Sequence, residues 1–325
     1  DGEAIAQEIA AFDGDVALAA EVDPPPILDE AAMRASTRAE RLLATPPRVI
    51  LGTLKKQLAR EDIVAALAFT PVAPDIRVDL REDVLAAALG PAFADGERAP
   101  RDAEFKVSGK KVVLVPDRAG RGVDMARLAR TLVRRAGKPQ TGARFEQIQA
   151  TFTTEDAEKL KITEQVSTFF TPYTCCPDRV TNIRQAAKVL DGVIIPPDGI
   201  FSLNKELGQR TTERGFVPAG QITAGKLEDA VGGGVSQVAT TLYNAAFFAG
   251  LDIIDHTPHQ FYISRYPAGR EATVSWGGPE LIFKNDWPAS ILVKMSADTP
   301  GITVSFYSSK LGRRVETESG PRTGI

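Results

Sequence analysis

Two hydrophobic periods alternate along the first half of the chain. Apolar residues three or four positions apart predict helices, and short alternating or continuous apolar runs predict strands. Asp124 directly precedes one such helical pattern and is the residue type that favours an N-cap. We therefore expect helices at 4–11, 28–43, 60–68, 82–89, 125–135 and 154–160, and strands at 15–22, 47–51, 76–80, 103–107, 110–115 and 143–152.

Part of this pattern occurs twice. Residues 1–10 are similar to residues 123–132, and the segments that follow each of them also correspond, at an offset of about 125 residues. We assign residues 1–45 to the C-terminal part of a first repeat and residues 46–162 to a second, complete one. The order of a strand, Gly122-Val123-Asp124 and a helix resembles the YoaR-like domain named for peptidoglycan binding, which recurs in tandem before catalytic domains in Gram-positive cell-wall proteins. The alternative is a generic α+β spacer.

The second half of the chain has a different pattern. A helix is predicted to open at 181–187, a turn at 196–204 leads into a strand, and three consecutive glycines at 232–234 precede a long apolar helical segment. Residues 163–312 are assigned to one domain and 313–325 to a flexible tail. Further strands are expected at 260–265, 272–276, 280–284, 290–295 and 302–307, with the last three forming a meander that completes a sheet. The whole chain is predicted to be α+β, its C-terminal domain with an N-terminal helix packed on a largely antiparallel sheet.

Composition narrows the choice of function. The 325 residues give room for about two domains, and 43% hydrophobic with 25% charged residues is typical of a globular protein. A net charge of −3 gives no support for nucleic-acid binding. No apolar run approaches the roughly 18 residues of a membrane span, and no signal-peptide pattern is present. Because the chain starts at Asp1 rather than Met, we expect any targeting or anchoring segment to lie upstream.

Only two histidines and two cysteines are available for acyl-transfer or metal chemistry. Ser236 follows the glycines at the start of a helix, where unpaired backbone N–H groups and the helix dipole favour negative charge. If the strands at 260–265 and 272–276 pair, His259 and Glu271 face each other. The chain order of nucleophile, histidine and acid then follows the logic of a catalytic triad.

The segment from about 164 to 307 resembles a VanW domain of the actinobacterial type. The resemblance rests on N-I-x-x-A-A at 182–187, P-x-G-x-F-S-x-N at 197–204, G-x-R-T at 208–211, G-G-G-V-x-Q-V-x-T-T-L-Y-N-A-A at 232–246 and G-R-x-A-T-V at 269–274. The family was named from glycopeptide (vancomycin) resistance clusters. It implies a cell-envelope protein and, in some members, an L,D-transpeptidase that cross-links peptidoglycan stems through a cysteine thioester.

This chain departs from the family motif at two positions. Ser236 stands where the family commonly carries cysteine, and Glu271 stands where many members have aspartate. A serine needs a positioned base to remove its proton, whereas a thiol is partly ionised at neutral pH. Three hypotheses follow: a serine triad of Ser236, His259 and Glu271; a displaced nucleophile at Cys175 or Cys176; or a module that binds wall polymer without catalysis, in which Ser236 caps a helix.

The resemblance and the residue types also suggest which side chains bind substrate. Arg210 and Arg270 are expected to bind stem-peptide carboxylates. The other residues expected to line the groove are Gly232, Gly233, Gly234, Gln237 and Asn204. The expected partners are peptidoglycan stem peptides or glycan, and the expected location is the extracytoplasmic cell envelope, with a membrane anchor upstream of Asp1.

No metal site or cofactor is expected. His256, His259 and the two cysteines are too few and too oddly spaced for a structural zinc site, and no cofactor signature occurs in the sequence.

Overall fold

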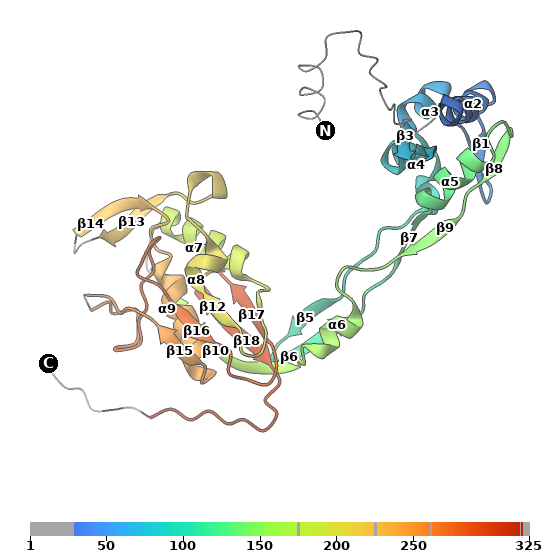
Figure 1. Cartoon of the computed structure of the whole chain (residues 1–325). Coiled ribbons are helices and arrows are strands. Elements are labelled where there is room, and N and C mark those ends of the chain that lie inside the picture. The colour runs from blue at the N-terminus through green and yellow to red at the C-terminus, as the bar shows by residue number, and fades with distance from the viewer. Residues whose placement is uncertain (1–28, 174–175, 224–225, 261, 319, 321–325) are drawn as a thin grey trace, which may run out of the picture. The chain divides into compact units, whose positions relative to one another are not determined.

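The computed structural model describes residues 29–173, 176–223, 226–260, 262–318 and 320, and it divides the chain into two compact units (Figure 1). One unit consists of Asp1–Pro100 and Ala119–Ile148, and the other of Arg101–Arg118 and Gln149–Ile325. The segment 46–162 therefore contributes to both units. Both contain helices and mostly antiparallel strands, so the predicted α+β class is confirmed.

In the described part of the first unit, four helices and short strands enclose an apolar core. Helix α5 (Met125–Arg134) turns Leu128 and Leu132 into this core, and the Asp124 carboxylate accepts a hydrogen bond from the Arg127 N–H, as the predicted N-cap. β1 and β8 form the one parallel pair among the described strands. The other elements of this unit are α2 (Asp29–Ala44), β1 (Arg48–Leu51), β2 (Leu54–Gln57), α3 (Arg60–Ala66), β3 (Leu67–Val72), β4 (Asp75–Leu80), α4 (Glu82–Phe93), η1 (Ala94–Gly96), β7 (Gly120–Val123), β8 (Gln140–Gly142) and β9 (Phe145–Ile148).

The second unit contains a six-stranded antiparallel sheet in the order β11-β17-β18-β10-β6-β5. Helix α9 (Ser236–Phe248) packs against β10 and β18, and helix α7 (Pro177–Leu190) packs against β17. The sheet strands are β5 (Glu104–Ser108), β6 (Lys111–Val115), β10 (Glu164–Pro172), β11 (Ile194–Ile195), β17 (Ile291–Ser296) and β18 (Gly301–Ser308).

A smaller sheet and a hairpin complete this unit. The small sheet has the order β12-β16-β15, and β13 pairs with β14. Their bounds are β12 (Ile200–Ser202), β13 (Pro218–Thr223), β14 (Lys226–Val231), β15 (Asp252–Asp255) and β16 (Ile282–Lys284), and the short helices are α6 (Thr154–Lys159), α8 (Leu203–Leu207) and η2 (Thr212–Arg214).

Helix α9 lies at the centre of the second core. Every residue from Gln237 to Ala246 is buried, so its polar side chains must find partners inside the protein. None of the helices in the described part of the chain combines the length and the apolar character needed to cross a membrane.

Most predicted elements are present with shifted ends, and several predictions were wrong. The described residues of 260–265 and 272–276 form no strand. The expected meander is split, because β16 joins the small sheet while β17 and β18 pair in the large one. β10 was not predicted at all. The helix expected at 4–11 and the strand expected at 15–22 lie outside the described residues.

Candidate active site

The backbone before α9 requires glycine at three consecutive positions. A Cβ atom at Gly233 would lie 2.0 Å from the carbonyl oxygen of Ala219. Gly232 and Gly234 adopt positive φ angles of 90° and 100°, which side-chain-bearing residues rarely adopt. The turn delivers Ser236 as the first residue of α9, with Val235 at the N-cap position.

His259 and Glu271 are in direct contact. The Nδ1 atom of His259 lies 2.8 Å from Oε2 of Glu271, and the two side chains are only 9% and 8% exposed. The imidazole also stacks on the ring of Tyr266, with 5.4 Å between ring centroids. A neutral imidazole that donates its Nδ1 proton to Glu271 keeps a lone pair on Nε2 that can accept a proton.

The electrostatic surroundings keep His259 neutral. Burial, reinforced by the positive charges of Arg265 and Arg179, lowers the pKa of His259 to about 4. Burial raises the pKa of the Glu271 carboxyl above its usual value. Although an ionised Glu271 would by itself favour imidazolium, we expect burial and the two arginines to dominate, so that the pair contains neutral histidine at neutral pH.

A polar stripe on α9 holds the segment that carries Glu271. Ser236, Thr240 and Asn244 occur at four-residue spacing, which places them on one face of the helix. The Ser236 Oγ accepts a hydrogen bond from the Val274 N–H at 3.3 Å. The Thr240 hydroxyl donates to the Ala272 carbonyl and accepts from the Ala272 N–H. The Asn244 amide donates to the carbonyl of Arg270. Side chains of α9 therefore satisfy the backbone that was expected to form a strand.

This arrangement brings Ser236, Glu271 and His259 to the same region of the unit. Val274 is bonded to Ser236 and lies three residues after Glu271, which in turn contacts His259. Among the described residues, however, no hydrogen bond joins the Ser236 hydroxyl to the His259 ring.

The structure describes only one of the two cysteines that were considered as nucleophiles. Cys176 is the N-cap residue of α7, with a φ of 75°, and its sulfur is in a disulfide. Cys175 lies outside the described residues. A disulfide sulfur is not a thiolate, so Cys176 would need reduction before it could act as a nucleophile.

The side chains predicted to bind substrate are engaged in internal contacts. The Gln237 side chain is buried, with its residue 1% exposed, and its Nε2 donates to Thr171 Oγ1 and to the carbonyl of Pro172. Arg210 donates to the Asn204 amide oxygen at 2.5 Å, and Arg270 lies 4.8 Å from the centroid of the Phe248 ring.

Two residues at the site were missed from the sequence. Nη2 of Arg179, in the first turn of α7, donates to Gln237 Oε1 at 3.2 Å and to the Tyr266 hydroxyl at 3.4 Å. These contacts span 58 and 87 residues of sequence, and no local pattern identifies either side chain.

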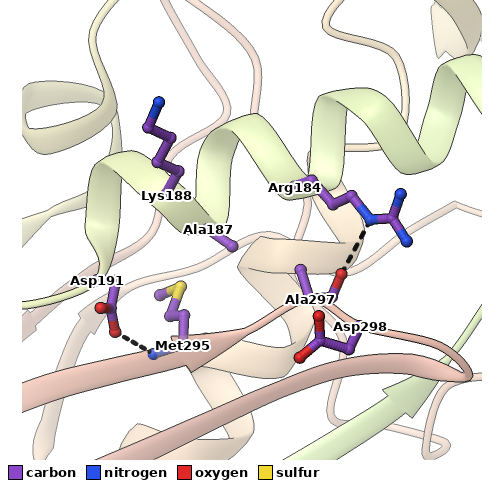
Figure 2. Close-up of a pocket in the computed structure, with 7 residues that line it drawn as sticks. All are labelled: Arg184, Ala187, Lys188, Asp191, Met295, Ala297 and Asp298. Carbon is purple, nitrogen blue, oxygen red and sulfur yellow. Dashed lines mark hydrogen bonds between the residues drawn. The ribbon is translucent and has the colours of Figure 1, made fainter.

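A separate open pocket of about 300 Å³ lies farther along α7 (Figure 2). Figure 2 shows Arg184 and Lys188 projecting from helix α7, with Arg184 donating to the carbonyl of Ala297 in the turn after β17. The Asp191 carboxylate accepts from the N–H of Met295 within β17. None of Ser236, His259 and Glu271 lines this pocket. Within the described residues, no group of three or more His, Cys, Asp or Glu side chains is arranged to hold a metal ion.

The larger unit is thus an α+β domain with a serine at a glycine-rich helix start and a buried histidine–carboxylate pair nearby. Residues 178–307 match the family "VanW like protein", and residues 52–143 match the family "Putative peptidoglycan binding domain". The chain therefore contains a VanW-like domain and a domain similar to peptidoglycan-binding ones, and it is a cell-wall-related protein.

Two relatives support this assignment. The YoaR protein of Bacillus subtilis is 36% identical over 148 residues, which cover 45% of this chain and 49% of YoaR. The vancomycin B-type resistance protein VanW of Enterococcus faecalis is 25% identical over 140 residues, which cover 41% of this chain and 50% of that protein. The chain therefore spans about half the length of these relatives. No solved structure matches it.

Proposed function

We propose that the VanW-like unit transfers an acyl group of a peptidoglycan stem peptide, in the manner of an L,D-transpeptidase, with Ser236 as the nucleophile. The observation that carries the proposal is the buried 2.8 Å contact between His259 and Glu271. Such a pair orients the imidazole and leaves Nε2 available as a base, which is the role a serine nucleophile requires. The peptidoglycan-binding family match and the VanW match support the choice of substrate.

Each group has a defined part in the reaction. As the Ser236 Oγ attacks the amide carbonyl carbon, its proton passes to His259 Nε2, and the positive end of the α9 dipole favours the developing oxyanion. The tetrahedral intermediate collapses by breaking the C–N bond, and the imidazolium gives its proton to the leaving amine. A second amine, or water, then attacks the Ser236 ester and releases the serine hydroxyl.

A non-catalytic, peptidoglycan-binding role is the second candidate. It is favoured by the bond between the Ser236 Oγ and the Val274 N–H, because this contact uses the hydroxyl as part of the structural stripe with Thr240 and Asn244. On this alternative the serine stabilises the packing of the segment after Arg270 and performs no chemistry.

Mass spectrometry of muropeptides distinguishes the candidates. The protein is incubated with tetrapeptide-stem muropeptides, and the products of the unmodified chain are compared with those of Ser236→Ala, His259→Ala and the double Cys175→Ala, Cys176→Ala variant. We expect cross-linked or trimmed products from the unmodified chain and the double-cysteine variant only. Loss of products in the double-cysteine variant would assign the nucleophile to a cysteine, and the absence of products from the unmodified chain, with and without reductant, would support the binding role.

A further inference from the structure

The Arg179 side chain contacts Gly234 and Gln237, which lie on either side of the proposed nucleophile in the sequence. A Cβ atom built at Gly234 would lie 2.5 Å from Arg179 Cγ and 3.4 Å from its Nη1, so the side chain packs over the residue two positions before Ser236. Its Nη2 donates to Gln237, the residue directly after Ser236. Arg179 therefore contacts residues that precede and follow Ser236 in the sequence.

The position of this guanidinium is fixed by neutral groups. Gln237 is itself held by Thr171 and Pro172, and the hydroxyl of Tyr266, which also accepts from Arg179, belongs to the ring that stacks on His259. Gln237 is thus a positioning residue for Arg179. The orientation of the guanidinium is set before any ligand arrives, which reduces the entropic cost of binding one.

The charge of Arg179 is not balanced by a carboxylate. None of the ion pairs within the described part of the chain includes Arg179, and the nearby Glu271 is bonded to His259. Burial lowers the pKa of Arg179, which shows that the protein environment disfavours the charge. An arginine that is partly removed from water and held only by neutral partners is suited to an anionic ligand, because a carboxylate would replace the lost solvation.

We propose that Arg179 binds the terminal carboxylate of the stem peptide, on the residue whose amine leaves when Ser236 attacks. This inference rests on the proposed function for the location of the scissile amide. In a peptide the terminal carboxylate and the last amide bond are separated by one residue. A cation near the nucleophile that binds this carboxylate would therefore place the last amide bond at Ser236. The Nη1 and Nε donors, which make no hydrogen bond among the described residues, are available for the carboxylate.

Binding measurements in a Ser236→Ala background test the proposal without turnover. The probes are a stem tetrapeptide with a free C-terminal carboxylate and the same peptide with a C-terminal amide, titrated by calorimetry. We expect the acid to bind roughly tenfold or more tightly than the amide. The added substitution Arg179→Gln should abolish this preference, and Arg179→Lys should retain part of it.

Arg184→Gln is the matched control, because Arg184 lies on the same helix and also donates a hydrogen bond, to Ala297, away from Ser236. It should leave the acid preference unchanged. Equal affinity for acid and amide, survival of the preference in Arg179→Gln, or binding of neither peptide would overturn the proposal. An acid preference that depends on Arg179, in a chain whose unmodified form gives no product, would instead retain the carboxylate site and contradict only the proposed reaction.

Discussion

Burial and neighbouring charges both lower the pKa of His259. Its imidazole is almost fully enclosed, contacts Glu271, and lies in the field of two arginines. The folded protein consequently holds this side chain neutral at pH values where an exposed histidine is protonated.

This predicts an acid-dependent loss of stability. The pKa of His259 is about 4 in the folded protein and 6.5 when unperturbed, so as pH falls below about 6.5 the unfolded chain binds the proton first. The free energy of unfolding should fall from pH 6.5 to 4, and this residue contributes at most about 3 kcal/mol to the fall. Urea unfolding at several pH values should show a shallower dependence in His259→Gln, and parallel profiles for the two proteins would contradict the assignment.

Glu271 should also affect how the stability of the protein depends on pH. Because its raised pKa contributes stability that is lost as pH rises, its contribution to stability has the opposite sign to that of His259. In the proposed reaction Glu271 orients the imidazole, so Glu271→Gln should reduce kcat by about a thousandfold or more in the muropeptide assay. Glu271→Asp, which keeps the charge with a shorter reach, is the control and should retain more activity. An unchanged kcat in Glu271→Gln would exclude the triad.

Among the elements, α9 does most to shape the site. The polar side chains of its stripe, Ser236, Thr240 and Asn244, bond the backbone of segment 270–274 in place of a neighbouring strand. The glycine turn before the helix packs closely against β13. Hydrogen bonds from helix side chains thus position Glu271, where the sequence pattern favoured a β ladder.

The glycine turn can be tested by a pair of matched substitutions. Gly233→Ala would place a methyl group 2.0 Å from the Ala219 carbonyl oxygen, so it should destabilise the protein by about 3 kcal/mol or more. Gly142→Ala, at an exposed position of β8, meets no atom within 4 Å and should change the free energy of unfolding by less than about 0.5 kcal/mol. Thermal unfolding of both variants checks this, and similar melting temperatures would show that the close approach is unimportant.

The sequence predicts elements better than contacts. Helical periodicity located α4 and α5, and the Asp124 cap was confirmed, because these features depend on neighbouring residues. The strand expected at 272–276 was wrong because side chains of α9 bond its backbone at Ala272 and Val274. The described residues of 260–265 form no strand either. The contact of His259 with Glu271 was expected only if the two strands paired, but it forms between segments that are not strands. Arg179 was missed because its partners lie 58 and 87 residues away.

At the scale of the whole molecule, the β5–β6 hairpin is separated in sequence from the rest of its unit. Residues 101–118 join the second unit, and β6 extends the sheet beyond β10. Phe105, Val107 and Val112 pack on a small cluster that includes Leu292 and Tyr307, and the Tyr307 hydroxyl donates to the carbonyl of Gly109. The hairpin therefore covers an edge of the VanW-like unit.

Two fragments test this architecture. One contains residues 101–325 with 119–148 replaced by a short Gly-Ser linker, and the other begins at 149 and lacks the hairpin. The first should unfold cooperatively and be more stable by about 2 kcal/mol or more, because the second exposes the apolar cluster and the edge of β10. Equal urea midpoints and equal solubility would show that the hairpin is not part of the unit.

In the proposed reaction Ser236 forms an ester with the stem peptide, and intact-protein mass spectrometry after an acid quench would detect this ester. We expect an added acyl mass that peptide mapping locates on Ser236. This mass should persist in the double Cys175→Ala, Cys176→Ala variant and be absent from Ser236→Ala. An adduct on a cysteine, or no adduct under conditions in which the peptide is bound, would contradict the proposed reaction.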